Sequence, residues 1–331
     1  MTTRRTFMGL GLAGAAGLIT APPRVFAQQK LQDVTYLLPA PGSLPAFAPW
    51  MIALQRGYFR DEGLNVTFQV ARGGVDVAKM VGAGNAVVGG AIGDTPILVR
   101  ANGIPVRSIA VLGGRSLMQL VVNKDKQINS LVDLKGKTIT TIAYQDTTYF
   151  ALLGMLGTVG LTKNDVNAQA VGPVNVWKLF ASGQADAMAS VPDWTYYAKD
   201  AAPQMNTQVI PSDTVFKSMA QAIVASDDTI AKNPELLRKL VRATLRGLKA
   251  VMDDPVSAAA DYAKAVPEHA GKEAKVVEVM RGYNTYVYPG QKRLGEMDEA
   301  RLAGLQDFYL KEGIISRKAP LSELYTNQFI G

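Results

Sequence analysis

The sequence predicts an α/β fold made of two similarly built lobes joined by two crossing segments. The main observation is a repeat. Residues 70–95, shifted by 99 positions, align with a second stretch of the same character. Both copies contain a glycine-bounded turn, a helix, a small-residue turn and a short apolar strand that ends near an aspartate. The identical pairs are Gly73 and Gly172, Lys79 and Lys178, Gly84 and Gly183, Ala86 and Ala185, and Asp94 and Asp193.

Two further observations support two lobes. The chain has 331 residues, of which 48% are hydrophobic, enough for two substantial cores. A flexible elbow, Gly113-Gly114-Arg115-Ser116, follows one apolar strand, and a later strand at 219–225 can return the chain. We therefore predict that residues 28–115 and 225–331 form lobe one and that residues 116–224 form lobe two.

The N-terminal residues 1–27 have the features of a signal peptide. Arg4-Arg5 lies in a stretch that resembles the twin-arginine export motif, and a mild apolar stretch follows. Val25-Phe26-Ala27 offers small residues for cleavage before Gln28. The apolar stretch is shorter than the roughly 20 residues that span a bilayer, so no membrane anchor is expected. The sequence predicts a periplasmic protein exported by the twin-arginine route.

Composition excludes several classes of site. The net charge of +7 includes arginines of the signal peptide, and no dense basic run remains, so nucleic-acid binding is not expected. The chain has no cysteine, which rules out disulfides, thiolate metal sites and a cysteine nucleophile. The single histidine, His269, lies in a Glu-His-Ala-Gly turn and is expected on the surface. We predict no catalytic residue, no metal and no cofactor.

In lobe one, strand 34–38 is stopped by a loop with three prolines, and a helix is expected over 47–59. Strand 66–70, the first copy of the repeat and strand 105–112 complete the lobe. Lobe two begins with strand 117–123 and continues with strand 138–143, a helix over 149–159 and the second copy.

The C-terminal third is predicted to be helical. Asn233 is expected to cap a long amphipathic helix with Pro234 in its first turn, and Asp253-Asp254-Pro255 ends it. Helices over 258–266, 272–287 and 297–312 follow and are expected to pack around lobe one.

Several motifs, in order, carry a family resemblance. Residues 53–66 have the pattern A-x-x-x-GYF-x-x-EGL-x-V, and a G-x-x-D-V-A helix, IGDTP at 92–96, SLVDLKGKTI at 130–139 and NPELL at 233–237 follow. This series resembles the periplasmic solute-binding proteins of the nitrate/sulfonate/taurine branch of ABC importers, a branch that is similar to thiamin-pyrimidine synthases. The resemblance implies the two-lobe periplasmic-binding-protein fold of type II and no catalysis. It also implies a small-molecule solute held between the lobes. The implied protein partners are an ABC permease and its ATPase subunit, and the binding protein itself is expected to be a monomer.

Candidate ligand-binding residues lie in the loops expected at the cleft, because helix N-termini, hydroxyls, charges and aromatic rings hold solutes there. They are Ser43, Leu44, Gly74, Asp94, Thr95, Arg115, Gln145, Asp146, Thr147, Thr148, Tyr149, Asn175, Asp193 and Trp194.

Each candidate also has a structural interpretation. Asp94 can cap the helix at Thr95-Pro96, Thr147 and Thr148 can cap the helix at Tyr149, Arg115 can pair across the lobes and Trp194 can pack in a core.

The charge of the ligand stays open at this point. Arg115 and helix amides suit a sulfonate, nitrate or similar anion. Asp94, Asp146 and Asp193, near Trp194 and Tyr149, suit a neutral or cationic nitrogen heterocycle such as a thiamin-precursor pyrimidine. We place the anion first, because all three aspartates can be helix caps.

Two other classes use a similar fold. Fungal thiamin-pyrimidine synthases consume an active-site histidine and carry a cysteine-rich iron motif, which this chain lacks. A sensor that reports a solute to a membrane receptor is not separated from a transport receptor by the sequence.

The paired arginines give a first prediction. Changing Arg4 and Arg5 together to lysine should leave uncleaved precursor in the cytoplasm, because the export machinery reads the arginine pair. Immunoblots of cell fractions measure precursor and mature protein. Normal maturation in a strain without the twin-arginine pathway would contradict the assignment.

Overall fold

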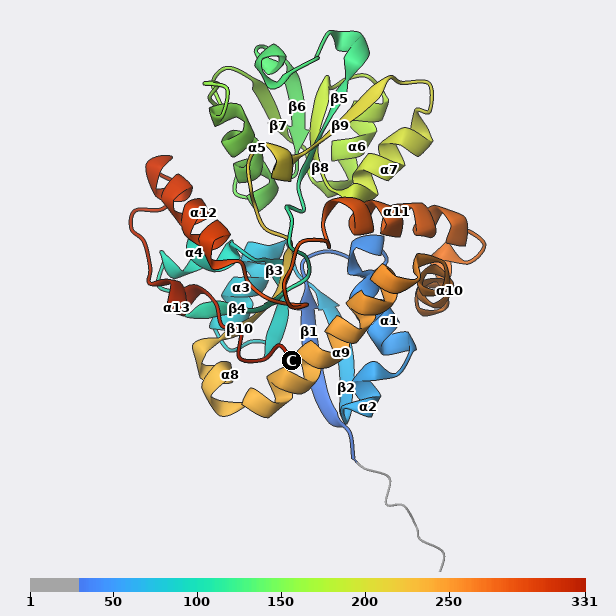
Figure 1. Cartoon of the computed structure of the whole chain (residues 1–331), viewed down its shortest axis with the longest axis vertical. Coiled ribbons are helices and arrows are strands. Elements are labelled where there is room, and N and C mark those ends of the chain that lie inside the picture. Colours follow the sequence, from blue (N-terminus) through green and yellow to red (C-terminus); the bar gives the residue numbers. More distant parts are fainter. Residues whose placement is uncertain (1–29) are drawn as a thin grey trace, which may run out of the picture. The chain divides into compact units, whose positions relative to one another are not determined.

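Two five-stranded mixed sheets form the framework of the protein (Figure 1). The computed structural model describes residues 30–331, so the predicted signal peptide lies outside the described residues. The first sheet has the order β2-β1-β3-β10-β4 and contains β1 (Gln32–Leu38), β2 (Leu64–Val70), β3 (Val88–Ile92), β4 (Val106–Val111) and β10 (Gln221–Ser226). The second has the order β7-β6-β8-β5-β9 and contains β5 (Gln119–Asn123), β6 (Thr138–Thr141), β7 (Asn167–Ala170), β8 (Ala187–Ser190) and β9 (Thr207–Pro211).

The two sheets share one plan, which confirms the predicted α/β fold with two similar lobes. In the first, β1 is parallel to β2 and β3, and β10 is antiparallel to β3 and β4. In the second, β6 is parallel to β7 and β8, and β5 is antiparallel to β8 and β9. The chain crosses between β4 and β5 and returns between β9 and β10, so two segments join the lobes. The predicted boundaries at 115/116 and 224/225 stay a prediction.

The sequence repeat corresponds to a structural repeat. Helix α3 (Gly74–Gly82) and helix α6 (Pro173–Ala181) begin and end 99 positions apart. Each is preceded by a glycine with positive φ, 101° at Gly73 and 75° at Gly172. Side chains other than glycine rarely adopt this conformation, so the paired glycines fix the turn that starts each helix.

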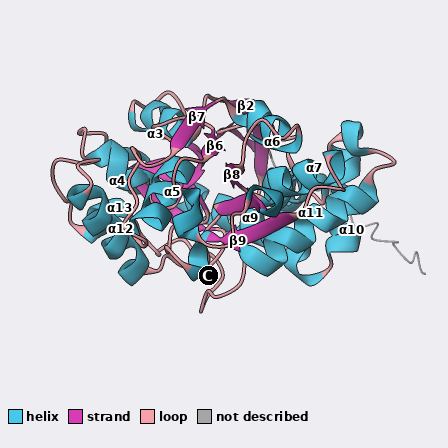
Figure 2. Cartoon of the chain, turned by 90° about the horizontal axis from the view of Figure 1, so that it is seen from above, coloured by secondary structure: helices cyan, strands magenta, loops and turns pink. Residues whose placement is uncertain are grey.

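Helices cover the sheets, as Figure 2 shows, with α3, α4, α12 and α13 on one side of the view and α7, α10 and α11 on the other. The helices of the strand-bearing part are α1 (Ala48–Gln55), α2 (Tyr58–Asp61), α3, α4 (Thr95–Arg100), α5 (Thr147–Gly157), α6 and α7 (Pro192–Ala201). The C-terminal ones are α8 (Asp227–Lys232), α9 (Pro234–Asp253), α10 (Pro255–Ala265), α11 (Glu273–Tyr286), α12 (Glu299–Lys311) and α13 (Leu321–Leu324). Short 3₁₀ turns are η1 (Pro45–Phe47), η2 (Lys124–Lys126), η3 (Leu131–Leu134), η4 (Ser212–Thr214) and η5 (Pro267–His269).

Two local predictions were wrong. The single helix expected over 47–59 is divided into η1, α1 and α2, because Gly57 takes a left-handed conformation with φ 75° between α1 and α2. Asn233 precedes α9 as predicted, but its side chain makes no capping hydrogen bond. The amphipathic character of α9 is confirmed, since its apolar face is buried. It packs closely on α1, where a Cβ at Gly247 would lie 1.9 Å from the carbonyl oxygen of Pro49.

The crossing segments are braced by the C-terminal region, so the elbow predicted to be flexible is held in place. The amide of Arg115 donates to the carbonyl of Val287 over 3.0 Å. At the return crossing, Arg301 on α12 pairs with Asp213 and donates to the carbonyl of Ser218. Asp213 also accepts from the amide of Ser116 over 2.9 Å, which ties the two crossings together. No helix within residues 30–331 is both long and apolar enough to cross a membrane.

This brace gives a second prediction. A Cβ on Gly114 would lie 2.6 Å from the amide nitrogen of Gln291 and 2.7 Å from the carbonyl oxygen of Pro289. Gly114→Ala should therefore lower the free energy of unfolding by about 1–3 kcal/mol, the usual cost of overpacking. Gly304→Ala is the control: it lies on α12 with nothing within 4 Å of the added carbon and should stabilise by up to about 1 kcal/mol. Denaturant melts compare the two, and equal stability of wild type and Gly114→Ala would contradict the brace.

Candidate ligand-binding site

A cavity of about 420 Å³ lies where strand ends from both sheets meet. Its walls come from the segments that follow β1, β2 and β3 in the first sheet and β6, β7 and β8 in the second. These six strands are parallel within each sheet, so in each sheet their carboxyl ends gather at one edge, the usual place for ligands in open α/β sheets. Leu117 and Gln221, from the crossing segments, complete the wall with Tyr283 of α11.

Many of the sequence-predicted site residues meet at this cavity. They come from segments more than a hundred residues apart, and those that line it are Leu44, Gly74, Thr95, Asp146, Thr147, Thr148, Asp193 and Trp194. Thr95 and Trp194, each in the first turn of a helix that follows a strand of the repeat, therefore border one space.

The other predicted residues do not line the cavity. Gln145 and Asn175 are exposed, and Asn175 donates to the carbonyl of Val171. Tyr149 is buried with its ring against Tyr144 and Phe150. The remaining three are Ser43, Asp94 and Arg115.

His269, expected on the surface, is half-buried. Its Nε2 lies 2.7 Å from the carbonyl oxygen of Ser43, and its ring packs on Tyr262. The expectation of a solvated side chain was wrong, because residues far apart in sequence cover the turn.

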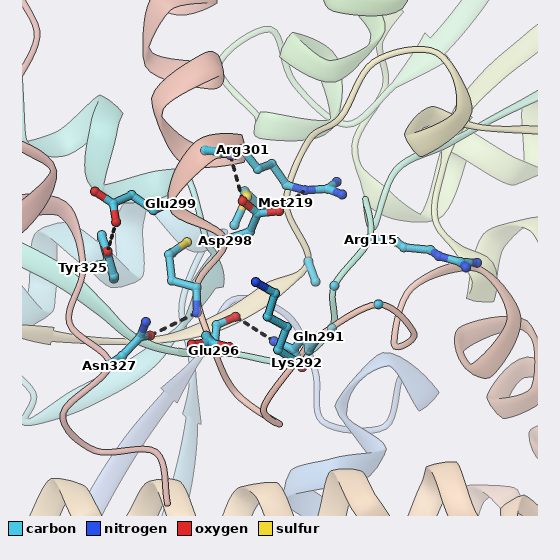
Figure 3. Close-up of a pocket in the computed structure, with 16 residues that line it drawn as sticks. Arg115, Met219, Gln291, Lys292, Glu296, Asp298, Glu299, Arg301, Tyr325 and Asn327 are labelled. Atoms are coloured by element: carbon cyan, nitrogen blue, oxygen red, sulfur yellow. Dashed lines mark hydrogen bonds and ion pairs between the residues drawn. The ribbon is translucent and has the colours of Figure 1, made fainter.

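Arg115 belongs to a second hollow of about 410 Å³ beside the crossing segments (Figure 3). Its guanidinium points away from the other labelled side chains in that view and donates to the carbonyl of Thr285 over 3.0 Å. Arg115 is exposed and does not line the cavity at the strand ends.

Asp193 is fully engaged by groups from outside its own sheet. Its Oδ2 accepts from the amide of Ala46 over 2.9 Å, and its Oδ1 accepts from the hydroxyl of Tyr283 over 2.6 Å. Burial raises the pKa of Asp193, and these two hydrogen bonds oppose that rise. This carboxylate joins α7 to η1 and α11, so it holds the cavity wall together.

Asp94, its partner in the repeat, is also buried beside a tyrosine. It precedes α4 but makes no side-chain capping bond, so the predicted cap at Thr95-Pro96 was wrong. Oδ2 accepts instead from the hydroxyl of Tyr309 on α12, and Oδ1 has no partner among the described residues. Burial raises the pKa of Asp94 to about 6, although the Tyr309 hydroxyl opposes the rise.

Asp146 caps α5, which begins at Thr147 rather than at Tyr149. Its Oδ1 accepts from the amide of Thr148 over 2.9 Å, so the predicted caps, Thr147 and Thr148, are the first residues of the helix. Asp146 is half-buried and lines the cavity, and burial raises the pKa of its carboxyl against the Thr148 hydrogen bonds.

Sequence reasoning missed several lining residues. Leu117, Gln221 and Tyr283 come from separate parts of the chain, and no local pattern marks them. Arg72 had a signal, because it directly precedes the glycine that opens the first repeat. It is exposed at the cavity and is the one cation among the lining residues.

The cavity has apolar and aromatic walls with few charges, which suits reversible binding of a small organic molecule. The amides at the start of α3 have no side-chain cap and can donate to a ligand. Within residues 30–331 no group of three histidine, cysteine or acidic side chains is arranged to hold a metal.

Comparison with known proteins places the chain in a family. Residues 44–258 match the family described as NMT1/THI5 like. The chain belongs to the NMT1/THI5-like family. It is 27% identical over 322 residues to the riboflavin-binding protein RibY of Chloroflexus aurantiacus, covering 94% of this chain and 90% of that protein. It is 27% identical over 237 residues to 4-amino-5-hydroxymethyl-2-methylpyrimidine phosphate synthase of Aspergillus parasiticus, covering 67% of this chain and 68% of that enzyme.

Solved structures confirm the two-lobe fold. The aliphatic sulphonate binding protein SsuA of Escherichia coli superimposes with a TM-score of 0.70 at 16% identity, over 88% of this chain and 96% of that one. The nitrate-binding protein NrtA of Synechocystis PCC 6803 superimposes with a TM-score of 0.65 at 11% identity, over 91% and 87%. At these identities the likeness concerns the fold.

The buried Asp94 gives a third prediction. The folded-state pKa of Asp94 is about 6, above the usual 3.8. The stability of the fold is therefore highest below about pH 3.8, where the carboxyl is neutral in both states, and falls as the pH rises through 6. Asp94→Asn keeps an acceptor for Tyr309 and removes the charge. The variant should match wild type near pH 3.5 and be more stable above pH 6, by at most about 3 kcal/mol.

Denaturant melts across this pH range test the difference. Asp228→Asn is the control: Asp228 is exposed and paired only with Lys232, so it should change stability by less than about 1 kcal/mol. A constant difference between Asp94→Asn and wild type at all pH values would contradict the titration.

Proposed function

We propose that this protein is the periplasmic solute-binding receptor of an ABC importer and that its ligand is a planar nitrogen heterocycle, neutral or cationic. This is the second of the two ligand classes that the sequence left open. The observation that carries the proposal is the lining of the 420 Å³ cavity, which pairs aromatic walls with buried acceptors rather than with buried cations.

The charges favour this class over a small anion. Asp146 and Asp193 line the cavity, and Asp94 lies close behind it. The one lining cation, Arg72, is exposed, and Arg115 lies beside the crossings. An anion would approach two carboxylates in a site of low polarity, where repulsion between like charges is strong. A ring N–H or a cationic ring would be attracted by the same groups.

The walls favour a flat molecule. Trp194 is 6% exposed and Phe47 is 4% exposed, and both line the cavity with Tyr283. Aromatic side chains bind flat rings by stacking and by burial of apolar area. The volume falls within the range of about 300–1,000 Å³ that is usual for small organic ligands.

The relatives support the same chemistry. The protein aligned over 94% of this chain is named for riboflavin, and the synthases are named for an aminopyrimidine. Both names denote flat nitrogen heterocycles. The structures named for sulphonate and nitrate share 16% and 11% identity and support only the fold.

Binding without turnover fits the residues at the cavity. The chain has no cysteine, and its one histidine, His269, does not line the cavity.

The proposal also includes export to the periplasm, a monomeric receptor, and a permease with its ATPase subunit as partners. A transport receptor needs its permease for uptake, so a mutant without the permease should not grow where growth depends on the ligand. Normal growth of that mutant would favour a sensor.

A ligand screen tests this proposal. Purified mature protein should show a rise in its thermal midpoint with riboflavin or with 4-amino-5-hydroxymethyl-2-methylpyrimidine, and none with taurine or nitrate. A ligand at 100 times its Kd adds about 2.7 kcal/mol of stability. A shift with taurine or nitrate alone would overturn the heterocycle and restore the anion.

Two variants locate the site by calorimetric titration. Trp194→Ala should weaken binding of the identified heterocycle by about 1–3 kcal/mol, because a stacked wall is lost. Arg115→Ala is the matched control and should leave Kd unchanged within about threefold, since it lies outside the cavity. If Trp194→Ala lowered stability while Kd stayed the same, Trp194 would be a core residue and the cavity would not be the site.

A further inference from the structure

The cavity contains one buried amide that its surroundings leave unsatisfied. Gln221 is 6% exposed, lines the cavity, and its carbonyl oxygen Oε1 has no hydrogen-bond partner among the described residues. A buried polar group without a partner costs about 1–3 kcal/mol, so it calls for an explanation. This oxygen has almost no accessible surface as the side chain stands. A half-turn about the terminal torsion, which is roughly two-fold in glutamine, exchanges it with the accessible amide nitrogen and so brings it within reach of a molecule in the cavity.

The position of Gln221 is fixed by the fold. It is the first residue of β10, directly after the return crossing, and it lies opposite Ile92, the last residue of β3. Its own carbonyl accepts from the amide of Leu112 over 2.7 Å, so its backbone is held between two neighbouring segments. With the backbone fixed, only the side-chain torsions have to be set when a ligand binds.

The second sheet has a glutamine at the equivalent place. Gln119 is the first residue of β5 and lies opposite Ser190, the last residue of β8. Its Oε1 accepts from the hydroxyl of Thr195 over 2.7 Å, and it does not line the cavity. The amide nitrogen of Gln119 is buried and has no partner among the described residues, so each glutamine leaves one amide atom unpaired. Of the two, only Gln221 borders the cavity, and it is the one whose oxygen is unpaired.

We propose that Gln221 reads the edge of the ligand, accepting an N–H with its carbonyl oxygen while its amide donates to a neighbouring ring acceptor. This rests on the proposed function and names the chemistry within it. A glutamine amide pairs in this two-bond manner with any ring edge that sets a donor beside an acceptor, as it does with adenine. Riboflavin has such an edge, a ring N–H flanked by two carbonyls. An aminopyrimidine has one in its amino group and the adjacent ring nitrogen.

Gln221→Met tests the assignment, because methionine has a similar length and makes no such hydrogen bonds. The probes are riboflavin and 4-amino-5-hydroxymethyl-2-methylpyrimidine, and calorimetry measures the Kd of each. We expect the variant to bind the active probe at least tenfold more weakly, about 1.4 kcal/mol. We expect the ligand-free variant to be as stable as wild type or more so, because an unpaired buried group has been removed.

Gln306→Met is the matched control. Gln306 is 4% exposed on α12, and its amide exchanges two hydrogen bonds with the backbone of Ala319, at 3.0 and 2.8 Å. This variant should lose stability and keep the wild-type Kd. The two glutamines therefore predict opposite outcomes, which a general effect of the substitution would not produce.

A changed ligand tests the same contact without a variant. N3-methylriboflavin lacks the ring N–H, and 5-hydroxymethyl-2-methylpyrimidine lacks the amino group. Wild type should bind the analogue of its active probe at least tenfold more weakly, and Gln221→Met should show no further loss. A Kd for Gln221→Met within twofold of wild type would overturn the role of Gln221 and leave the receptor in place. Binding of neither heterocycle by wild type would overturn the proposed function, and this assignment with it.

Discussion

The carboxylate of Asp193 is the contact on which the arrangement of the cavity depends. It lies in the first turn of α7, next to the second sheet, and takes both its hydrogen bonds from η1 and α11. A carboxylate buried in this way is stable only while its partners remain, because an unpaired buried charge is costly. The pairs with Ala46 and Tyr283 thus hold two distant parts of the chain at a fixed separation. Ala46, Asp193 and Tyr283 all line the 420 Å³ cavity, so these hydrogen bonds fix part of its wall.

The two aspartates of the repeat are held in the same way, each by the hydroxyl of a tyrosine. Asp94 pairs with Tyr309 of α12 much as Asp193 pairs with Tyr283 of α11. In both cases a strand-end carboxylate from the repeat meets a tyrosine from the C-terminal helices. Those helices also brace the crossings through Arg301 and the backbone at Val287. The C-terminal third therefore acts as a frame: it fixes the crossings and the cavity wall, and leaves other groups for a ligand.

Some polar groups at the cavity are used by the framework, and only the remaining ones can recognise a solute. Asp193 is occupied by the framework, and Asp146 gives one oxygen to the cap of α5. Gln221 has an oxygen that no described residue satisfies, and Trp194 and Phe47 give flat walls. A protein that keeps an unpaired polar group at a cavity gives up stability there in exchange for selectivity, since a ligand without the matching group leaves it unpaired. The walls and this amide together describe a flat ring with a mixed hydrogen-bonding edge.

The sequence by itself determined the two α/β lobes, the repeat and the turns that begin α3 and α6. These follow from local patterns: apolar periodicity, and glycines such as Gly73 and Gly172 at positions with positive φ. It also placed Thr95 and Trp194 after equivalent strands, whereas the packing of the two sheets decides that both line one cavity. Only the tertiary structure decided what each polar group does. Asp94 could be a cap from its neighbours in sequence, yet Tyr309, 215 positions away, takes its hydrogen bond instead. Arg115 lies beside the crossings rather than at the cavity, and Gln221 and Tyr283 line the cavity although no local pattern marks them. A hydrogen bond depends on which atoms lie within about 3 Å, and for buried side chains that is set by packing between distant segments.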